Sequence, residues 1–191
     1  MALVLASASP RRKELLEMLG VRGFAVVPAP DGEETPPAGL SPAETVKHIA
    51  LGKARAVAAL RAPDDTVIAA DPLVYLGDEP LGKPAGEEDA RRMLRMLSGR
   101  GHTVYTGIAV ISGGEVRTRA VATDVYFREL TEGEIERYVA TGEPLDKAGA
   151  YGAQGRAAVF IRSISGDFFN VVGLPLCALS EILDGFGVEL A

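Results

Sequence analysis

The sequence predicts a mixed α/β fold, in which parallel and antiparallel strands share one β-sheet with flanking helices. In the first half of the chain, apolar runs of strand length alternate with segments that carry helix-start signals, an order typical of parallel strands joined by helices. In the second half, the β-like runs 102–111 and 119–130 are joined by "SGGE", which favours a hairpin. We therefore expect a mixed sheet and not a purely parallel one.

The elements of the first half are marked by local signals. Ser9 is a good N-cap and Pro10 suits the first helical position, so a helix begins there and ends near Gly20. "SPAE" at 41–44 has the form of a capping box. The strands expected here are 2–7, 24–30 and 66–76, the last interrupted at Asp71-Pro72, and the later helices are 42–60 and 86–99.

The second half continues with a further capping box, "TEGE" at 131–134, which begins a helix that reaches about Ala140. Residues 146–155 contain three glycines and almost no core pattern, which indicates a shaped loop. The remaining elements expected are two strands at 157–161 and 170–174, separated by a polar turn, and a last helix over about 175–185.

Length and composition favour an ordinary globular protein with one domain over residues 1–191. The net charge of −6 argues against a general nucleic-acid binder, and neither a signal peptide nor a membrane-spanning run stands out. A single cysteine, Cys177, excludes an intramolecular disulfide and suits a cytoplasmic protein, and its apolar surroundings predict that it fills the core.

Charged residues in the helix expected at 42–60 depart from the amphipathic pattern. Lys53 lies in the middle of an apolar stripe, whose other members are Val46, Ile49, Ala50, Val57 and Leu60. A lysine there either extends out of the core to water or points into a binding site, and the pattern alone leaves both readings open.

Asp71 and Lys83 raise the same kind of question. Asp71 ends the buried run "VIAA", where a parallel strand reaches the ligand-binding edge of a sheet, although Asp-Pro is also a common way to begin a turn. Lys83 lies between Gly82 and Pro84, which restrain the loop that carries it.

The helix that begins at Ser9 has Arg11 and Arg12 in its first turn, where the helix dipole already places positive charge. An anion bound at this end of the helix would offset the unfavourable positive charge. A polyphosphate complexed with magnesium requires both cations, here Arg11, Arg12, Lys53 and Lys83, and carboxylates, here Glu33, Glu34 and Asp71.

Four long blocks then make a specific resemblance visible. They are "LASASPRRKELLEMLG", "VIAADPLVYLGDEPLGKP", "MLSGRGHTVYTGIAV" and "DKAGAYGAQG" with "ISGDFFNVVGLP", in that order along the chain. Through them the chain resembles the Maf family of nucleoside triphosphate pyrophosphatases. The resemblance implies an inosine-triphosphatase-like fold with two lobes around a deep cleft, commonly a homodimer, and a reaction that depends on Mg²⁺ or Mn²⁺.

The resemblance also implies roles for individual residues. Ser7, Ser9 and Arg12 match the positions that bind phosphate in the family's opening motif. Asp71 matches the catalytic aspartate after the buried strand, and Glu34 matches the acid before the second helix; our hypothesis is that these two carboxylates hold the metal. Lys53 and Lys83 match the helix and loop lysines of the catalytic set.

Three positions resemble those that separate the branches of the family. Arg11 and Gln154 are similar to the branch that acts on dTTP and UTP, whereas the branch that acts on 7-methylguanosine triphosphate has tryptophan and glutamate there. Pro72 departs from the pyrimidine branch, which usually has threonine, because proline offers neither a hydroxyl nor an N–H group. Other modified nucleotides, or a non-catalytic nucleotide-binding regulator of cell division, are the alternatives.

Overall fold

The chain divides into two compact units in the computed structural model, which describes residues 2–30 and 35–190. Unit 1 comprises Met1–Asp71, Thr106–Val121 and Gly173–Ala191, and unit 2 comprises Pro72–Tyr105 and Ala122–Val172. Each unit has a hydrophobic core made from its own residues. The expectation of two lobes agrees with this division, whereas the cleft and the single domain stay predictions.

In the part of the chain that the structure describes, the β-sheet has seven strands in the order β2-β1-β3-β5-β6-β7, with β4 paired to β3. β1 pairs in parallel with β2 and β3, whereas β3 with β4 and β6 with β7 are antiparallel, so the predicted mixed sheet is confirmed. The strands are β1 (Leu3–Leu5), β2 (Ala25–Val26), β3 (Thr66–Leu76), β4 (Glu79–Leu81), β5 (Gly101–Ser112), β6 (Glu115–Phe127) and β7 (Ile161–Ser165). The "SGGE" turn joins β5 to β6 as expected.

In unit 1, helix α2 (Pro42–Ala58) packs against one face of the strands through small and β-branched residues. Ala50, Ala54 and Val57 of α2 form one cluster with residues of β1, β3 and β5, all buried. The helix lies so close to β5 that a Cβ atom at Gly107 would come within 2.0 Å of the Val46 carbonyl oxygen. Only glycine, which has no Cβ atom, permits this close contact between helix and strand. The residue at position 107 therefore limits where α2 can lie.

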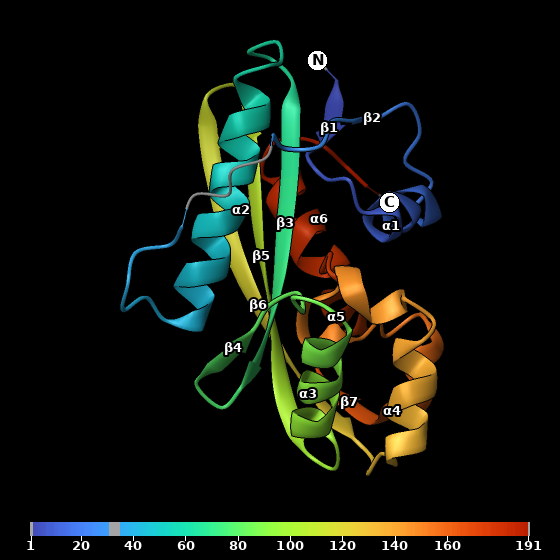
Figure 1. The fold of residues 1–191 in the computed structure, drawn as a ribbon. Helices are drawn as coiled ribbons and strands as arrows, with labels where there is room; N and C mark the ends of the chain where they lie inside the picture. Colours follow the sequence, from blue (N-terminus) through green and yellow to red (C-terminus); the bar gives the residue numbers. More distant parts are fainter. Residues whose placement is uncertain (1, 31–34, 191) are drawn as a thin grey trace. The chain divides into compact units, whose positions relative to one another are not determined.

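The opposite face of the unit 1 strands is buried as well. Leu5, Ile68 and Ile108 alternate with the residues that face α2, and none of them is exposed to solvent. Helix α6 (Leu176–Asp184) contributes Leu179 and Leu183, which are also fully buried. Figure 1 shows α2 and α6 on opposite sides of β3, and α1 (Pro10–Met18) on the same side as α6.

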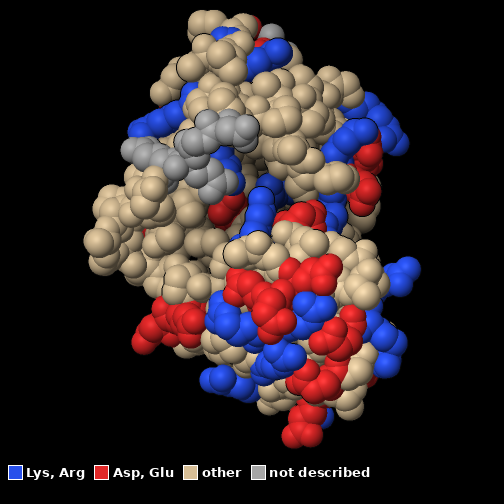
Figure 2. All heavy atoms as spheres, in the orientation of Figure 1, with Lys and Arg blue, Asp and Glu red and all other residues tan. Residues whose placement is uncertain are grey.

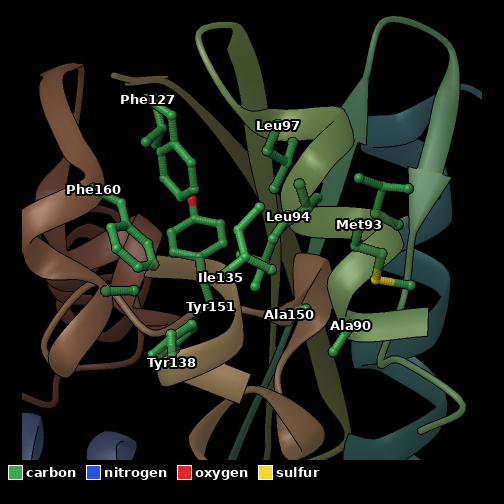
Figure 3. Packing of buried hydrophobic residues seen from close by; sticks show 14 of the residues in the cluster. Ala90, Met93, Leu94, Leu97, Phe127, Ile135, Tyr138, Ala150, Tyr151 and Phe160 are labelled. Carbon is green, nitrogen blue, oxygen red and sulfur yellow. The ribbon is translucent and has the colours of Figure 1, made fainter. Parts of the chain in front are cut away.

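Unit 2 packs two helices, α3 (Glu87–Leu97) and α4 (Glu132–Val139), around an aromatic core. Figure 3 shows Leu94 and Ile135 directed toward the rings of this core. Its rings meet edge to face, with Phe127 and Tyr151 at 4.8 Å and Tyr138 and Phe160 at 5.3 Å between ring centres. This geometry is favourable because the positive ring edge meets the negative ring face.

The start of α4 is fixed by the capping box that the sequence predicts. The Thr131 hydroxyl accepts a hydrogen bond from the Glu134 N–H, and the Glu134 carboxylate accepts one from the Thr131 N–H. The Thr131 hydroxyl also donates to the Glu134 carboxylate, and the Arg128 guanidinium together with the N–H and hydroxyl of Thr131 lowers the pKa of Glu134 to about 2. The equivalent box at Ser41 and Glu44 begins α2.

Charged side chains connect the outer surfaces of α3 and α4. Arg91 donates to Glu136 at 3.0 Å and Arg95 to Glu132 at 2.9 Å, so two arginines of α3 meet two glutamates of α4. In Figure 2 blue and red side chains alternate over these helices. Because most of these groups face water, each pair contributes little to stability at room temperature.

Four expectations from the sequence are wrong. β3 continues through Asp71-Pro72. A proline is tolerated there because the register of β3 with β1 ends at Ile68 and that with β4 begins at Val74. Leu60 is 65% exposed because α2 ends before it, at Ala58. Cys177 is exposed because it lies on the outer face of α6.

The fourth error concerns the two strands expected at 157–161 and 170–174. Arg156–Phe160 is a 3-10 helix (η3) and Phe168–Val172 is the short helix α5, whereas the strand β7 lies between them. Short apolar runs fit a strand or a buried helical turn equally well, so their pattern alone could not distinguish the two structures.

Among the described residues, no helix has the length and apolar character needed to cross a membrane.

A buried histidine makes the stability of unit 2 depend on pH. His102 is 3% exposed and shares a hydrogen bond of 2.8 Å with the Tyr151 hydroxyl. Burial lowers its pKa to about 4, against an effect of Asp124 in the other direction. As the pH falls, His102 of the unfolded chain therefore binds a proton before His102 of the folded chain does. The folded state loses stability as the pH falls from about 6.5 toward 4.

We expect the free energy of unfolding, measured with urea, to fall by about 2 kcal/mol between pH 7 and pH 5 through this group. In His102→Gln, which can still bond the Tyr151 hydroxyl, that part of the pH dependence should disappear. Equal pH slopes for both proteins would contradict the assignment.

Candidate active site

Lys53 and Asp71 form an ion pair at the end of the unit 1 core. The Lys53 ammonium donates to Asp71 Oδ1, and the two side chains are only 18% and 12% exposed. Lys53 is therefore not extended into water, whereas the reading in which it points into a binding site stays a prediction. The pair also shows that Asp71 does more than begin a turn.

The periodicity of both elements explains why these two groups meet. Val67 and Ala69 of β3 pack against α2, so Asp71, two residues further, continues on the same face. On α2, Lys53 lies on the same side as Ala50 and Ala54, which belong to that cluster. Removing both charges from water is costly, so each depends on the other.

A second cluster holds Arg12. Its Nη1 donates to Ser7 Oγ at 2.7 Å, and its Nε donates to the Gly173 carbonyl oxygen at 2.8 Å. Ser7 is 5% exposed, and its hydroxyl also accepts the Ser9 N–H at 3.1 Å. Two bonds from different nitrogens fix the plane of the guanidinium, which favours recognition of a planar or tetrahedral anion.

Helix α1 begins where the sequence predicts. Ser9 has an extended backbone and Pro10 occupies the first helical position, but the Ser9 side chain makes no capping hydrogen bond. The first turn contains no acidic residue, and both Arg11 and Arg12 are half-buried. Positive charge therefore collects at a helix end that already attracts anions.

Both clusters lie at the same edge of the parallel strands. β1 and β3 are in register from Leu3 opposite Thr66 to Leu5 opposite Ile68, and the Ala6 N–H donates to the Ile68 carbonyl oxygen. Ser7 follows β1 at its carboxyl end, and Asp71 lies within β3, three residues beyond the part that pairs in parallel with β1. This is the edge at which open α/β sheets bind their ligands.

The remaining described candidates belong to unit 2. Lys83 is exposed in the turn after β4, Gln154 is exposed in the loop 146–155, and Pro72 is half-buried in β3. The Gly149 N–H donates to the Gly82 carbonyl oxygen at 3.0 Å, so the loops that carry Lys83 and Gln154 are neighbours.

Glu34, with Glu33, lies outside the described residues. Within residues 2–30 and 35–190, no three histidine, cysteine, aspartate or glutamate side chains gather into a metal-binding group. Magnesium in nucleotide enzymes usually has one or two carboxylate ligands, completed by phosphate oxygens and water. Among the described residues, Asp71 offers one carboxylate of this kind.

Sequence reasoning missed the partner of Arg12 at Gly173. "NVVGL" reads as a strand, and a backbone carbonyl leaves no signal in the residue types around it. The structure instead places Gly173 between α5 and α6, where its carbonyl oxygen accepts from Arg12.

Comparison with known families identifies the chain's relatives. The family model described as "Maf-like protein" matches residues 2–186. The chain belongs to the Maf family. This membership covers both units, and the resemblance predicted from the sequence blocks is confirmed.

Curated Maf relatives are similar over nearly their full length. A protein of Pelotomaculum thermopropionicum named dTTP/UTP pyrophosphatase is 51% identical, over 98% of this chain and 98% of its own. One of Moorella thermoacetica with the same name is 54% identical, over 98% of this chain and 96% of its own.

Solved structures support the fold predicted for this Maf protein. A HAM1 protein from Coxiella burnetii superposes with a TM-score of 0.57 at 18% identity, over 97% of this chain and 99% of that one. The Staphylococcus aureus Ham1 protein gives 0.55 at 17% identity, over 97% of this chain and 99% of its own. At these identities the likeness concerns the fold alone.

A double-mutant cycle in this Maf protein tests how far Lys53 and Asp71 depend on each other. Lys53→Met leaves a nearly buried carboxylate without its ammonium, so we expect a loss of about 2–3 kcal/mol in the free energy of unfolding. Lys53→Met combined with Asp71→Asn should recover at least about 1 kcal/mol relative to the sum of the single losses.

The matched control is the exposed pair Arg119 and Glu181, whose side chains are 48% and 56% exposed. Arg119→Met and Glu181→Gln should show a coupling below about 0.5 kcal/mol. Urea unfolding measures both cycles, and additive losses at Lys53 and Asp71 would refute the dependence.

Proposed function

We propose that this chain is a nucleoside triphosphate pyrophosphatase that hydrolyses dTTP and UTP to the monophosphate and pyrophosphate. The observation that carries the reaction is the carboxylate–ammonium pair of Asp71 and Lys53, at the ligand-binding edge of the parallel strands. The substrate follows from the two Maf relatives described above, which are named for dTTP and UTP and share about half of its residues.

The proposed reaction requires a water molecule to attack the α-phosphorus. A bond forms between the water oxygen and this phosphorus, and the bond from the phosphorus to the bridging oxygen of pyrophosphate breaks. Asp71 would orient the water or accept its proton, a role for which a nearly buried carboxylate, held at one oxygen by Lys53, is well placed.

Cations would balance the charge that moves to the leaving group. Lys53 supplies positive charge beside Asp71, and Arg12 presents a guanidinium already oriented by Ser7 and Gly173. Ser7 and Ser9, with the N–H groups at the start of α1, add neutral donors for phosphate oxygens. Lys83 is the proposed further cation, from unit 2. Such preorganised groups commonly supply most of the rate enhancement.

The proposal includes a divalent metal, Mg²⁺ or Mn²⁺, with Asp71 and Glu34 as its protein ligands. When bound, the metal would neutralise charge on the triphosphate and its leaving pyrophosphate. The support for this part is the donor chemistry of Asp71, since oxygen ligands suit both ions.

Three residues would select the base. Gln154 carries an amide, which offers both the donor and the acceptor that a uracil or thymine edge requires. Arg11 lies in the first turn of the same helix as Arg12, whereas the bonds to Ser7 and Gly173 are made by Arg12, so the two arginines can have different roles. Pro72 offers no N–H, so its proposed contact with the base is limited to apolar atoms.

We take residues 1–191 as one Maf domain, because the family match runs through both units. The proposed protein is a cytoplasmic homodimer that acts on a small-molecule substrate, independently of nucleic acids and membranes. The net charge of −6 supports a substrate other than nucleic acid.

Replacing the proposed catalytic carboxylate tests the reaction directly. Asp71→Asn should lower the turnover of dTTP and UTP in the presence of Mg²⁺ by about 100- to 10,000-fold, because an amide cannot accept the proton of water. Pyrophosphate release is the measurement, and circular dichroism shows whether the variant is folded. Asp64→Asn, at an exposed aspartate of the same unit, is the matched control and should retain normal turnover. A folded Asp71→Asn variant with most of its activity would exclude the proposed role.

The same assay with a panel of triphosphates separates the alternatives. Pyrophosphate release from dTTP and UTP above all others supports the proposal. A preference for 7-methylguanosine triphosphate or another modified nucleotide would move the protein to a different substrate, and binding without release would indicate a regulator.

Exchange of Arg11 separates base selection from phosphate binding. Arg11→Trp should change the order of preference among nucleotides by about tenfold while the best substrate still reacts at a rate near that of the parent protein. The measurement is kcat/KM for UTP, dTTP and 7-methylguanosine triphosphate. Equal losses for all three would show that both arginines serve the phosphates.

A further inference from the structure

The loop that carries Gln154 contains a tight turn. The Gly155 N–H donates to the Gly152 carbonyl oxygen at 3.0 Å, so residues 152–155 form the turn with Gln154 in its third position. Gln154 is exposed, whereas Gly152 and Ala153 before it are buried. The amide of Gln154 is thus presented at the surface by a backbone that is anchored inside unit 2.

Two side chains hold this turn on either side of Gln154. The Tyr138 hydroxyl accepts the Gly152 N–H at 3.2 Å, and the Glu143 carboxylate accepts the Arg156 N–H at 3.1 and 3.2 Å. The same Tyr138 hydroxyl donates to Glu143 Oε1 at 3.0 Å. One connected pair therefore binds the backbone two residues before and two residues after Gln154. We call Tyr138 and Glu143 the turn brace.

The brace approaches the turn as closely as the backbone allows. A Cβ atom built at Gly155 would lie 2.0 Å from Glu143 Oε1, so a residue with a side chain would displace the carboxylate. The Lys147 ammonium donates to the Glu143 carbonyl oxygen at 2.7 Å and to the Asp146 carboxylate at 2.6 Å. Glu143 is thus held at its backbone carbonyl group by Lys147 and at its side chain by Tyr138.

The other end of the brace is part of the unit 2 core. Tyr138 lies on α4, is 4% exposed and packs edge to face on Phe160 (Figure 3). Burial raises the pKa of its hydroxyl, which therefore stays protonated and can donate to Glu143. The turn is in this way connected to the packed core through one hydroxyl and one carboxylate.

We propose that Tyr138 and Glu143 are positioning residues for base selection, which hold Gln154 in the orientation that distinguishes uracil and thymine from other bases. The proposal rests on the proposed role of Gln154 in this function. Its physical reason is that an amide discriminates donors from acceptors only when its position is fixed, because a mobile glutamine can rotate to satisfy either.

The test compares UTP with CTP, whose bases differ in the hydrogen-bonding groups of one edge. Tyr138→Phe removes the bridging hydroxyl and keeps the ring, and Glu143→Ala removes the carboxylate. Each should lower the UTP to CTP ratio of kcat/KM by about tenfold, mainly through KM, while kcat for UTP stays within about threefold. Glu143→Gln keeps one carbonyl acceptor and should recover part of the ratio.

Matched controls exclude a general effect of these exchanges. Tyr126→Phe alters an exposed tyrosine of β6, and Glu132→Gln alters an exposed glutamate of α4 that pairs with Arg95. Both lie in unit 2 and should leave the ratio unchanged. A merely structural role for the brace would instead lower kcat/KM equally for UTP and CTP.

Gln154→Ala completes the design and separates the two levels of the proposal. If the brace acts through Gln154, adding Glu143→Ala to Gln154→Ala should lower the ratio no further. An unchanged ratio in Gln154→Ala alone overturns the role of Gln154 and the brace proposal with it. A reduced ratio in Gln154→Ala, with an unchanged ratio in Tyr138→Phe and Glu143→Ala, overturns the brace proposal alone.

Discussion

The close approach of α2 to β5 at Gly107 is the constraint on which the unit 1 site depends. It allows the small residues of α2 to pack directly on the strands, so that the helix face carrying Lys53 comes within hydrogen-bond reach of Asp71. A larger residue at position 107 would move the helix outward and separate the pair. Packing of two secondary-structure elements thus sets the electrostatics of the site, since neither charge is stable there without the other.

The two anchored cations of unit 1 are oriented by different means. Lys53 is held by an opposite charge, whereas Arg12 is held by a hydroxyl and a carbonyl oxygen, which carry no net charge. The bonds to Ser7 and Gly173 fix the Arg12 guanidinium, so little side-chain entropy remains to be lost when an anion binds.

The sequence predicts those features whose cause is local. Both capping boxes could be predicted directly, and so could the unusual position of Lys53 in an apolar stripe, because each depends on neighbours within one helix. The strand expected at 170–174 and the core position of Cys177 were wrong, since short apolar runs do not reveal which side faces the core. Glu143 was missed because its role depends on a turn about ten residues later, which only the folded chain brings to it.

The arginine–glutamate contacts between α3 and α4 have a consequence for behaviour on heating. Hydration of charged groups becomes less favourable as temperature rises, so the cost of holding Arg91 and Arg95 against glutamates decreases. Contacts that add little at room temperature then contribute more, at the point where chain entropy most opposes the folded state. The ion pairs on the surface of unit 2 accordingly make a stabilising contribution that increases with temperature.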